Sequence, residues 1–563
     1  MTATVNGKAD APARSAQRVV EGVEAQGVRH IFGISGGKID EVYDVLHDQG
    51  PQLIVCRHEQ NAAFMAAAIG RLTGTPGVVL VTSGPGTTNL VTGLVTANTE
   101  GDPVVALCGA VPLTDRLKHT HQSMNAAALL SAVTKYTAEI TDPETVPEAV
   151  ENAFRAASTH PQGAAALVLA NDVMAAQTVA SITRAIHVPK LGPAPQADIE
   201  RAAALIRSAS RPVLLVGVRG ADHDACAAVR NLLKVTDLPI VETFQAAGVV
   251  SRELDSHYAG RVGLWKNQPG DVVVDRADAL VTIGYDPVEY DPRLWNADVA
   301  RAIVHIDTVP ALIDNHYRPA LELRGNVAAT VQALAASLRG LTLSGEFAEI
   351  VTTQRRMLKE IDDVAARGAH GPAGMNPASL VLQLRAALDD DATVAVDMGS
   401  NYIYMARHFR VHEPRHLLFS NGQQTLGVGV PWAMAAALVR PGKQIVSVSG
   451  DGGFLFSAME LETAHRLGLR FTHIIMRDNT YDMVGFEQLL KFGRKSGVQL
   501  GDYDVPHYAA AFGARGYRVN NPDDFVPTLK KALNEDGVSI LDVPVDYSHN
   551  VDIGAELHED QFA

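Results

Sequence analysis

The stretch QIVSVSGDGGFLFSAMELETAHRLGLRFTHIIMRDN, residues 444–479, decides the fold class of this chain. It contains an apolar run, a Gly-Asp-Gly turn, a segment with a helical pattern, and a second apolar run that ends at Asp478. This order is typical of a strand–helix–strand unit with parallel strands. Because ligands bind at the carboxyl ends of parallel strands, Asp451 and Asp478 are predicted to lie together at one ligand-binding edge.

Short β-branched runs alternate with helical patterns along nearly the whole chain. This alternation predicts an α/β protein built from doubly wound parallel sheets. The runs interpreted as buried parallel strands are residues 77–86, 103–109, 165–172, 211–218, 238–244, 279–286, 302–309, 392–400, 444–452 and 471–479.

Two stretches rich in helix-breaking residues, 185–198 and 367–379, are interpreted as linkers. They divide the chain into three blocks of ordinary domain size. We therefore expect three domains that follow a flexible tail, with the boundaries 1–14, 15–188, 189–370 and 371–563.

Composition excludes several classes of function. The formal net charge of −15 argues against nucleic-acid binding, which needs a basic surface. The three cysteines are scattered, so neither a disulfide framework nor a zinc site is indicated. No signal peptide and no apolar run long enough to span a membrane is visible, so we expect a cytoplasmic protein without a membrane partner.

The acidic pair indicates a metal site. The glycines beside Asp451 allow a sharp turn and a close approach of the backbone to a ligand. The helix that follows would present its N-terminus to phosphate oxygens. Two carboxylates together with phosphates suit Mg²⁺, so the pair is predicted to hold Mg²⁺ on a diphosphate. The alternative is a helix-capping Asp451 and an ordinary turn residue at Asp478.

The same segment resembles the cofactor motif of thiamine-diphosphate enzymes. The resemblance implies that Asp451, Asp478 and the backbone carbonyl of Thr480 hold Mg²⁺. The family motif usually ends in Asn-Asn, whereas this chain has Asp478 followed by Asn479, so Asn479 stays an alternative ligand. The resemblance also places the glycines of the turn at the cofactor: Gly450, Gly452 and Gly453.

A second segment, residues 54–74, resembles the Arg-His-Glu segment of the same family. The resemblance implies that Glu59 bonds to the aminopyrimidine ring and activates the cofactor, a role that needs an enclosed carboxyl group. The alternative is a solvent-exposed turn in which Glu59 is a helix N-terminal acid. The family arrangement implies a pyrimidine-binding first domain, a diphosphate-binding third domain, and a dimer or tetramer with active sites between subunits.

Other stretches extend the resemblance to the catabolic acetolactate synthases: residues 31–40, 80–111, 121–125, 258–271, 284–296, 397–409 and 420–439. Such enzymes decarboxylate one pyruvate and condense the cofactor-bound two-carbon unit with a second pyruvate. The products are 2-acetolactate, for acetoin and butanediol formation, and CO₂. The alternatives are another thiamine-diphosphate-dependent 2-keto acid decarboxylase or aldehyde carboligase, and a protein that binds the cofactor without turnover.

The resemblance assigns further roles by position. Leu426 props the cofactor in its bent form, and the carbonyl of Gln424 meets its amino group. Residues Gly399, Ser400 and Asn401 lie near the diphosphate, where a turn exposes backbone N–H groups. Lys38 and Gln122 project into the substrate space as catalytic candidates. Residues 481–499 cover the site, with inward side chains at Tyr481, Met483, Val484 and Glu487.

The chain departs from the family pattern at Ser35, Gly37 and Glu487, where Pro, Ala and Gln are usual. A carboxylate at residue 487 would repel the carboxylate of an incoming acceptor. We expect this residue to disfavour larger acceptors. The middle block resembles the flavin-free version, because residues 216–222 do not form a GxGxxG fingerprint, so no FAD is expected.

Overall fold

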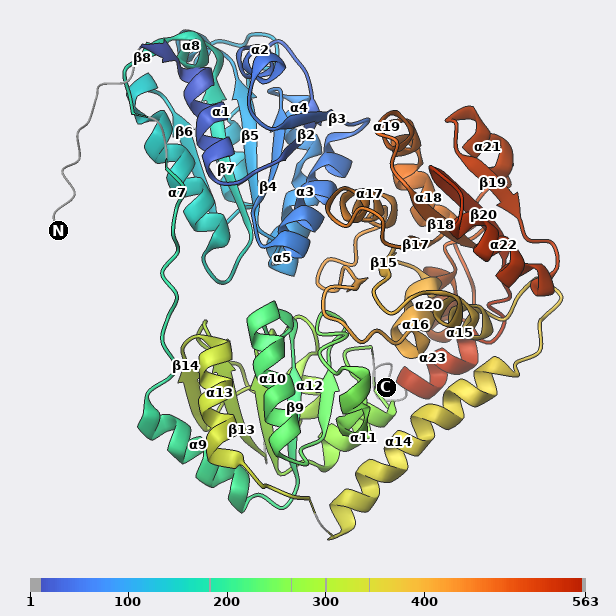
Figure 1. Ribbon diagram of the computed structural model, residues 1–563. Coiled ribbons are helices and arrows are strands. Elements are labelled where there is room, and N and C mark those ends of the chain that lie inside the picture. Colours follow the sequence, from blue (N-terminus) through green and yellow to red (C-terminus); the bar gives the residue numbers. More distant parts are fainter. Residues whose placement is uncertain (1–11, 182–183, 265, 299–300, 344, 559–563) are drawn as a thin grey trace. The chain divides into compact units, whose positions relative to one another are not determined.

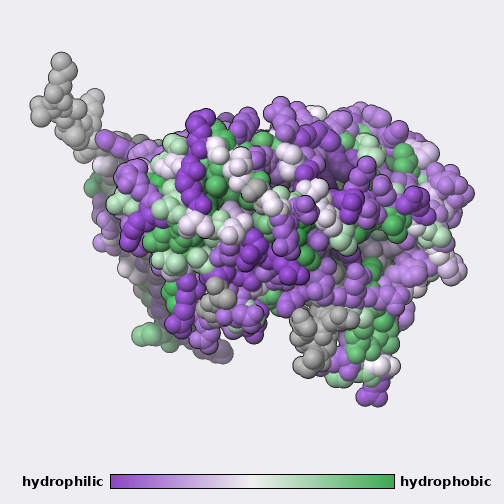
Figure 2. Space-filling view, turned by 90° about the horizontal axis from the view of Figure 1, so that it is seen from below, coloured by the Kyte–Doolittle hydropathy of each residue, from purple (hydrophilic) through white to green (hydrophobic). Residues whose placement is uncertain are grey.

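The computed structural model describes residues 12–181, 184–264, 266–298, 301–343 and 345–558. These residues form two compact units (Figure 1). The first unit comprises Met1–Pro189 with the short segments Met434–Pro441 and Met459–Leu467, and the second comprises the rest. Hydrophilic residues predominate on the face shown in Figure 2, with hydrophobic residues scattered between them. No helix in the described ranges is both long and apolar enough to cross a membrane.

The first unit is built on a six-stranded parallel sheet in the order β3-β2-β4-β5-β7-β6. Apolar residues of α1, α2 and α7 pack against one face of this sheet and form one buried cluster with it. The strands are β2 (His30–Ile34), β3 (Gln52–Val55), β4 (Gly77–Val81), β5 (Val104–Ala110), β6 (Tyr136–Ile140) and β7 (Ala164–Ala170). The helices are α1 (Ser15–Ala25), α2 (Asp40–Asp48), α3 (Glu59–Thr73), α4 (Pro85–Asn89), α5 (Val91–Glu100), α6 (Ala126–Ser131), α7 (Val146–Ser158) and α8 (Asn171–Ala175).

The second unit contains two further six-stranded parallel sheets, of which the middle one has the order β11-β10-β9-β12-β13-β14. Helices α9, α10 and α13 cover one face, and α11, α12 and the start of α14 cover the other, each with its own apolar cluster. The strands are β9 (Pro212–Val216), β10 (Ile240–Glu242), β11 (Tyr258–Arg261), β12 (Ala279–Ile283), β13 (Ala302–Asp307) and β14 (Leu321–Arg324). The helices are α9 (Gln196–Ser208), α10 (His223–Val235), α11 (Pro269–Arg276), α12 (Pro292–Trp295), α13 (Val327–Leu338) and α14 (Gly345–Ala366).

The C-terminal sheet has the order β16-β15-β17-β18-β20-β19. Chain order reverses between β15 and β17, so the sheet has a switch point there, where ligands bind in folds of this kind. The strands are β15 (Thr393–Val396), β16 (Leu417–Leu418), β17 (Ile445–Gly450), β18 (Phe471–Arg477), β19 (Arg515–Arg518) and β20 (Val538–Pro544). The helices that follow in this part of the chain are α15 (Pro377–Ala387), α16 (Ser400–His408), α17 (Gly429–Val439), α18 (Asp451–Ser457), α19 (Leu461–Arg466), α20 (Asp482–Phe492), α21 (Val505–Ala511), α22 (Phe525–Leu533) and α23 (Asn550–His558). Of these, α19 and the second half of α17 belong to the first unit.

The predicted fold class, three doubly wound parallel sheets, is confirmed. All ten runs interpreted as strands contain strands of these sheets. The helical segment after the Gly-Asp-Gly turn differs from expectation, because a 3-10 turn at Ala458–Glu460 separates α18 from α19. This tighter turn carries the buried Glu460, whose carboxylate accepts hydrogen bonds from the Arg57 and His58 backbones.

The N-terminal segment was expected to be a flexible tail through residue 14. Residues 1–11 of that tail lie outside the described residues. Ala13 and Arg14, however, form strand β1, which pairs antiparallel with β8 (Gln177–Thr178). Arg14 also donates to Glu41 at 2.8 Å, so ordered structure begins before the expected domain boundary.

Candidate functional site

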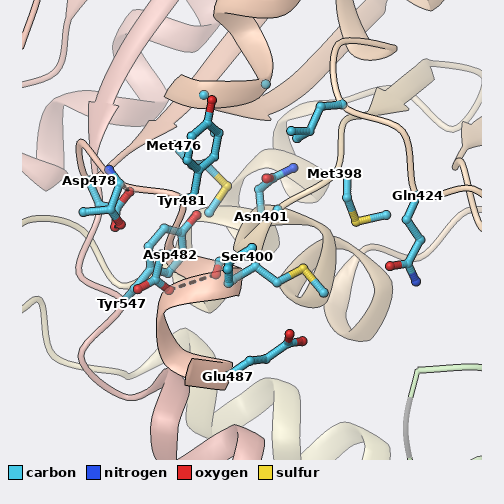
Figure 3. Close-up of a pocket in the computed structure, with 18 residues that line it drawn as sticks. Met398, Ser400, Asn401, Gln424, Met476, Asp478, Tyr481, Asp482, Glu487 and Tyr547 are labelled. Carbon is cyan, nitrogen blue, oxygen red and sulfur yellow. Dashed lines mark hydrogen bonds between the residues drawn. The ribbon is translucent and has the colours of Figure 1, made fainter. Parts of the chain in front are cut away.

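A cavity of about 270 Å³ lies at the switch point of the C-terminal sheet, where β15 and β17 end (Figure 3). Most of its lining consists of residues that the sequence had singled out: Gly399, Ser400, Asn401, Gln424, Leu426, Gly450, Gly452, Gly453, Asp478, Thr480, Tyr481, Met483, Val484 and Glu487. The sequence reasoning missed four further lining residues: Met398, Met476, Asp482 and Tyr547.

Asp451 and Asp478 follow two adjacent strands. Because Gly450 of β17 pairs with Met476 of β18, Asp451, the first residue of α18, and Asp478, which follows β18, lie at the same edge of the sheet, although only Asp478 lines the cavity. The Asp451 carboxylate accepts hydrogen bonds from the backbone N–H groups of Asn479 at 2.6 Å and Gly452 at 3.0 Å. Burial raises the pKa of Asp451, and burial raises that of Asp478 to about 6, so each charge is costly there without a counterion.

Asp478 lines the cavity, whereas Asn479 does not. Thr480 donates to Asp478 from its hydroxyl at 2.6 Å and its backbone N–H at 3.2 Å. Asn479 has a φ of 59°, and its side-chain oxygen accepts from Arg477 Nε at 2.9 Å. The left-handed backbone at Asn479 thus separates the two neighbouring side chains, and Arg477 already uses the amide oxygen.

Glycines at this edge leave room that other residues would fill. A Cβ atom at Gly452 would lie 2.4 Å from the Tyr481 ring, and one at Gly453 would lie 2.6 Å from Asp397 Oδ1. Gly399 has a φ of 139°, which a residue with a side chain rarely adopts. These three positions therefore require glycine, and they bring bare backbone to the cavity.

Asp397 is a buried residue that sequence reasoning did not assign. It follows β15, and its carboxylate accepts from the backbones of Met398, Gly427 and Gly429 at 2.8–3.0 Å. Burial raises its pKa to about 6. Through these bonds Asp397 fixes the loop that carries Gln424 and Leu426 into the cavity. An acid after a β-branched run was the available signal, as it was for Asp478.

A hydrogen-bonded group joins three helices beside the cavity. Ser400 at the start of α16 donates to Asp482 at 2.9 Å, the bond drawn in Figure 3. Asn550 of α23 donates to Ser400 at 3.0 Å and to Asp482 at 2.6 Å. Lys495 approaches Asp482 from the segment after α20 at 3.4 Å. No local sequence pattern marks Asn550, because its partners lie far away in the chain.

Two polar atoms at the cavity lack partners within the described part of the chain. These are the buried side-chain oxygen of Asn401 and the buried hydroxyl of Tyr547. Buried polar groups are almost always hydrogen-bonded, so these two atoms indicate that a polar ligand belongs in the cavity. No cluster of three or more His, Cys, Asp or Glu side chains that could hold a metal occurs among the described residues. Two carboxylates beside a phosphate-bearing ligand nevertheless fit Mg²⁺, which rarely receives an all-protein cage.

Glu487 projects from α20, and its carboxyl group points toward the other cavity side chains (Figure 3). It is half-buried and makes no hydrogen bond or ion pair with another described residue. Burial raises its pKa. Glu487 is therefore a carboxyl group in the lining that no other described side chain holds in a hydrogen bond or an ion pair.

In the first unit, Glu59 is the first residue of α3, and it is buried rather than solvent-exposed, with 8% of its surface accessible. Asn89, at the end of α4, donates to Glu59 Oε2 at 2.9 Å. A Cβ at Gly86 would lie 3.6 Å from Glu59 Oε1. The alternative of an exposed turn is therefore wrong. Glu59 is an enclosed carboxyl group with one oxygen fixed by an amide.

Two groups that the sequence did not single out hold the turn before Glu59. His58 caps α3, with its Nδ1 accepting from the Gln60 backbone at 3.1 Å. Glu460, which belongs to the same compact unit, accepts from the backbones of Arg57 and His58 and from the Asn61 side chain at 2.9–3.1 Å. These contacts fix the start of α3, and with it the position of Glu59.

Gln122 lies close to the same turn. Its φ is 60°, and Ser83 donates to its side-chain oxygen at 3.5 Å. A Cβ at Gly84 would lie 3.2 Å from the Gln122 side chain, so Gln122 and Glu59 border the same Gly84–Gly86 turn. Lys38 is half-buried in the loop after β2, and within the described residues it makes no hydrogen bond or ion pair with Gln122 or Glu59.

Comparisons with known proteins define the class. Residues 14–129 match the N-terminal TPP binding domain of thiamine pyrophosphate enzymes. Residues 199–334 match their central domain, and residues 397–543 match their C-terminal TPP binding domain. The three sheets therefore correspond in order to the three domains of that enzyme class.

Full-length relatives narrow the class. The chain is 51% identical to the acetolactate synthase of Bacillus subtilis, over 98% of this chain and 96% of that protein. It is 43% identical to a catabolic acetolactate synthase of Raoultella terrigena, over 98% of each chain. A probable acetolactate synthase large subunit of Methanocaldococcus jannaschii is 30% identical over 95% of this chain. The chain belongs to the acetolactate synthase family of the thiamine pyrophosphate enzymes.

Proposed function

We propose that this chain decarboxylates pyruvate and condenses the remaining two-carbon unit with a second pyruvate, giving 2-acetolactate and CO₂. The observation that carries the proposal is the cavity at the C-terminal switch point. It gathers the predicted cofactor residues in a chain whose full-length relatives are named acetolactate synthases. The unpartnered Asn401 oxygen and Tyr547 hydroxyl support a polar ligand in that cavity.

Asp451, Asp478 and the carbonyl oxygen of Thr480 would hold Mg²⁺ against the diphosphate of thiamine diphosphate. The bare backbone at Gly399, Gly450, Gly452 and Gly453 would admit the diphosphate close to the start of α16 and α18. Leu426 would support the ring system from below, and the Gln424 carbonyl would accept from its amino group. When bound, the cofactor supplies a carbon nucleophile and an electron sink for decarboxylation.

Glu59 would hold a proton at the pyrimidine ring of the cofactor. Asn89 occupies Oε2, which leaves Oε1 as the atom for that exchange. An enclosed carboxyl group exchanges a proton with a bound ring without competition from bulk water. His58 and Glu460 hold the backbone that aims Glu59, so they are positioning residues in this proposal.

Gln122 and Lys38 would contact the substrate, and Met483 and Val484 would exclude water from it. Water exclusion matters here because protonation of the two-carbon unit would release acetaldehyde instead of 2-acetolactate. Glu487 would face the acceptor. Its carboxylate would repel the carboxylate of any 2-keto acid acceptor. We propose that it also disfavours acceptors larger than pyruvate, because their longer alkyl chains would lie against a polar group.

The proposal includes no FAD. The corresponding edge of the middle sheet is filled by side chains: Arg219 pairs with Asp307 at 2.8 Å and with Asp286 at 3.2 Å. A Cβ at Gly284 would lie 2.2 Å from the Gly220 backbone, so the turns there pack directly on each other. This packing supports the flavin-free assignment.

Self-association into a dimer or tetramer, with active sites between subunits, is a further part of the proposal. It is supported by exposed apolar side chains on α18, Leu455 at 42% and Phe456 at 45% accessible. Large exposed apolar side chains that lie next to each other are typical of contact surfaces. We also propose a cytoplasmic, catabolic role in acetoin and butanediol formation, which the resemblance implies; the catabolic acetolactate synthase among the relatives supports the catabolic part.

The test is NMR identification of the products that purified protein makes from pyruvate with thiamine diphosphate and Mg²⁺. A cofactor-dependent formation of 2-acetolactate is expected. Glu59→Gln should lower turnover at least a hundredfold, since general acid–base catalysis typically contributes about 10²–10⁴-fold. The matched control is Glu462→Gln, on an exposed side chain of the same type, which should keep full turnover. Acetaldehyde as sole product would make the chain a decarboxylase.

The Glu487 proposal has its own test. Glu487→Gln removes the charge and keeps the shape, so it should raise the share of the 2-ketobutyrate product when pyruvate and 2-ketobutyrate compete. Glu346→Gln, at the exposed start of α14, serves as the control. An unchanged product ratio in Glu487→Gln would show that this carboxyl group does not select the acceptor.

A further inference from the structure

A second cavity of the second unit, about 280 Å³ in volume, lies among α14, the end of α16 and the segment leading into β11. We call it the α14–α16 cleft. It shares no lining residue with the cofactor cavity. Its lining contains four cationic side chains: Arg355, Lys359, Arg407 and Arg410.

The acids of the cleft do not neutralise these cations. Asp255 and Asp362 are the acidic lining residues. Asp255 accepts from Arg410 at 2.8 Å, and Asp362 accepts from the His408 ring at 2.8 Å. Burial lowers the pKa of His408. Four cations therefore face two carboxylates.

Arg407 is a partly buried cation of the cleft that has no acidic partner at hydrogen-bond distance among the described residues. It is half-buried, and its guanidinium makes no hydrogen bond or ion pair with any residue in the described ranges. Glu556 and Asp362 act on it only through the longer-range charge interaction, and burial lowers its pKa. A half-buried guanidinium without a protein partner keeps its five N–H donors available for an anion.

Arg410 also has an unused donor. Its guanidinium packs on the Tyr258 ring, 3.3 Å from the ring centre, and is only 21% exposed. Its Nη1 is buried without a hydrogen bond. The closest acid to that atom is Glu242 at 4.0 Å, whose carboxylate is also near Arg261. Two guanidinium groups with donors to spare therefore line one small cleft.

We propose that the α14–α16 cleft binds a small dianion of the phosphate class, either inorganic phosphate or the phosphate group of a small metabolite. Guanidinium groups present forked donors that match phosphate oxygens, and cationic side chains outnumber acidic ones in the lining of the cleft. Lys359, exposed on α14, adds a further cation at the cleft.

The test is calorimetric titration of inorganic phosphate into protein saturated with thiamine diphosphate and Mg²⁺, with ionic strength held constant by chloride. Saturation with the cofactor removes the diphosphate site from the measurement. One saturable phosphate site is expected, and Arg407→Met should weaken it about ten- to a hundredfold, the range for a charge-assisted hydrogen bond. The control is Arg356→Met, an exposed arginine on the same helix that pairs with Glu360.

Folding and ligand class are checked separately. Because Arg407→Met removes a half-buried unpaired charge, its melting temperature without phosphate should equal or exceed that of the unaltered protein. Tighter binding of glycerol phosphate than of inorganic phosphate would identify a phosphorylated metabolite as the occupant, and the reverse would identify the free ion. Acetate binding as tightly as phosphate, no saturable phosphate binding, or equal affinity in Arg407→Met would each overturn the proposal.

Discussion

The middle and C-terminal sheets of the second unit are both six-stranded and parallel, although their strand orders differ, and they use the edge at the switch point in opposite ways. Both reverse chain order at one point, between β9 and β12 in the middle sheet and between β15 and β17 in the C-terminal sheet. At the C-terminal switch point a cavity of about 270 Å³ is open. At the middle one, Arg219 donates to Asp307 and to the Tyr285 carbonyl, and thereby fills the space.

This difference shows that strand order creates a crevice at the switch point, and that the side chains there determine whether it is filled or open to a ligand. In the C-terminal sheet, buried carboxylates face bare backbone and unpartnered polar atoms, which calls for a ligand. In the middle sheet, Glu289 accepts from the Val218 and Asp286 backbones and from Thr243, so the acid's partners come from the protein. A sheet edge whose buried polar groups are hydrogen-bonded by the protein has a structural role. A sheet edge with buried polar groups that lack partners is a binding site.

The largest expected effect concerns the filled edge. Arg219→Met leaves Asp307, which is fully buried, without its main cationic partner. Breaking a buried ion pair from one side costs about 3–5 kcal/mol, so unfolding free energy should fall by that amount. Urea titration followed by circular dichroism measures it. Arg293→Met, which removes an exposed pair with Asp291, is the control. If Arg219→Met instead weakens cofactor binding tenfold, the filled edge belongs to the cofactor site.

The next effect comes from the same substitution at the two edges. Gly284 has a φ of 59°, and its Cβ would lie 2.2 Å from backbone, so Gly284→Ala should cost about 1–3 kcal/mol of stability. Gly452→Ala would meet the half-buried Tyr481 ring, which can shift into the cavity. It should therefore weaken thiamine diphosphate binding more than it lowers stability. Melting temperature and cofactor titration of both variants decide the matter, and a reversed pattern would refute the comparison.

A smaller effect separates the two neighbouring metal candidates. Asp478→Asn should weaken Mg²⁺-dependent binding of thiamine diphosphate at least tenfold, because it removes a charge that faces the cavity. It should not destabilise the cofactor-free protein, since burial raises the pKa of Asp478 to about 6 and its charge is costly there. Asn479→Gly, which suits a φ of 59°, is the control and should bind normally. If only Asn479→Gly lost binding, Asn479 rather than Asp478 would be the metal ligand.

The pH dependence of stability should also differ between the sheets. His473 of β18 is fully buried between Ser447 and Ser449, and burial lowers its pKa to about 3. Between that value and the ordinary 6.5 the unfolded chain binds more protons, so stability falls as pH falls, by at most about 1.4 kcal/mol per pH unit. Urea titrations at several pH values should show a flatter dependence in His473→Gln than in His507→Gln, which alters an exposed histidine.

Glu289 in the middle sheet should act with the opposite sign. Burial raises its pKa to about 7 from an ordinary 4.5, so in that interval the folded protein binds more protons than the unfolded chain. Its contribution to stability is therefore full below 4.5 and is lost as pH rises to about 7. Glu289→Gln should remove that loss in the same titrations, whereas Glu253→Gln, at an exposed residue, should not. An identical slope in both variants would contradict the assignment.

Most lining residues of the cofactor cavity were predicted from the sequence. Several of them directly follow a β-branched run, which marks the end of a strand. Asp478 and Gly450 are found in this way, whereas Ser400 was assigned through the family resemblance. Asp397 follows a run of the same kind and could have been found by the same rule. Asn550 and Glu460 could not, since each works through partners far away in the chain, Ser400 in one case and His58 in the other. Periodicity and strand-end rules register only neighbours in sequence.

The sequence by itself determined the fold class, because alternation of β-branched runs and helical patterns leaves a parallel sheet as the only way to bury both. It also determined which residues stand at the strand ends. Only the tertiary structure decided that Asp478 rather than Asn479 lines the cavity, that Glu59 is enclosed, and that Arg219 closes the middle edge. These outcomes depend on packing and hydrogen bonds between segments that are distant in the chain. Such contacts cannot be predicted from local sequence patterns.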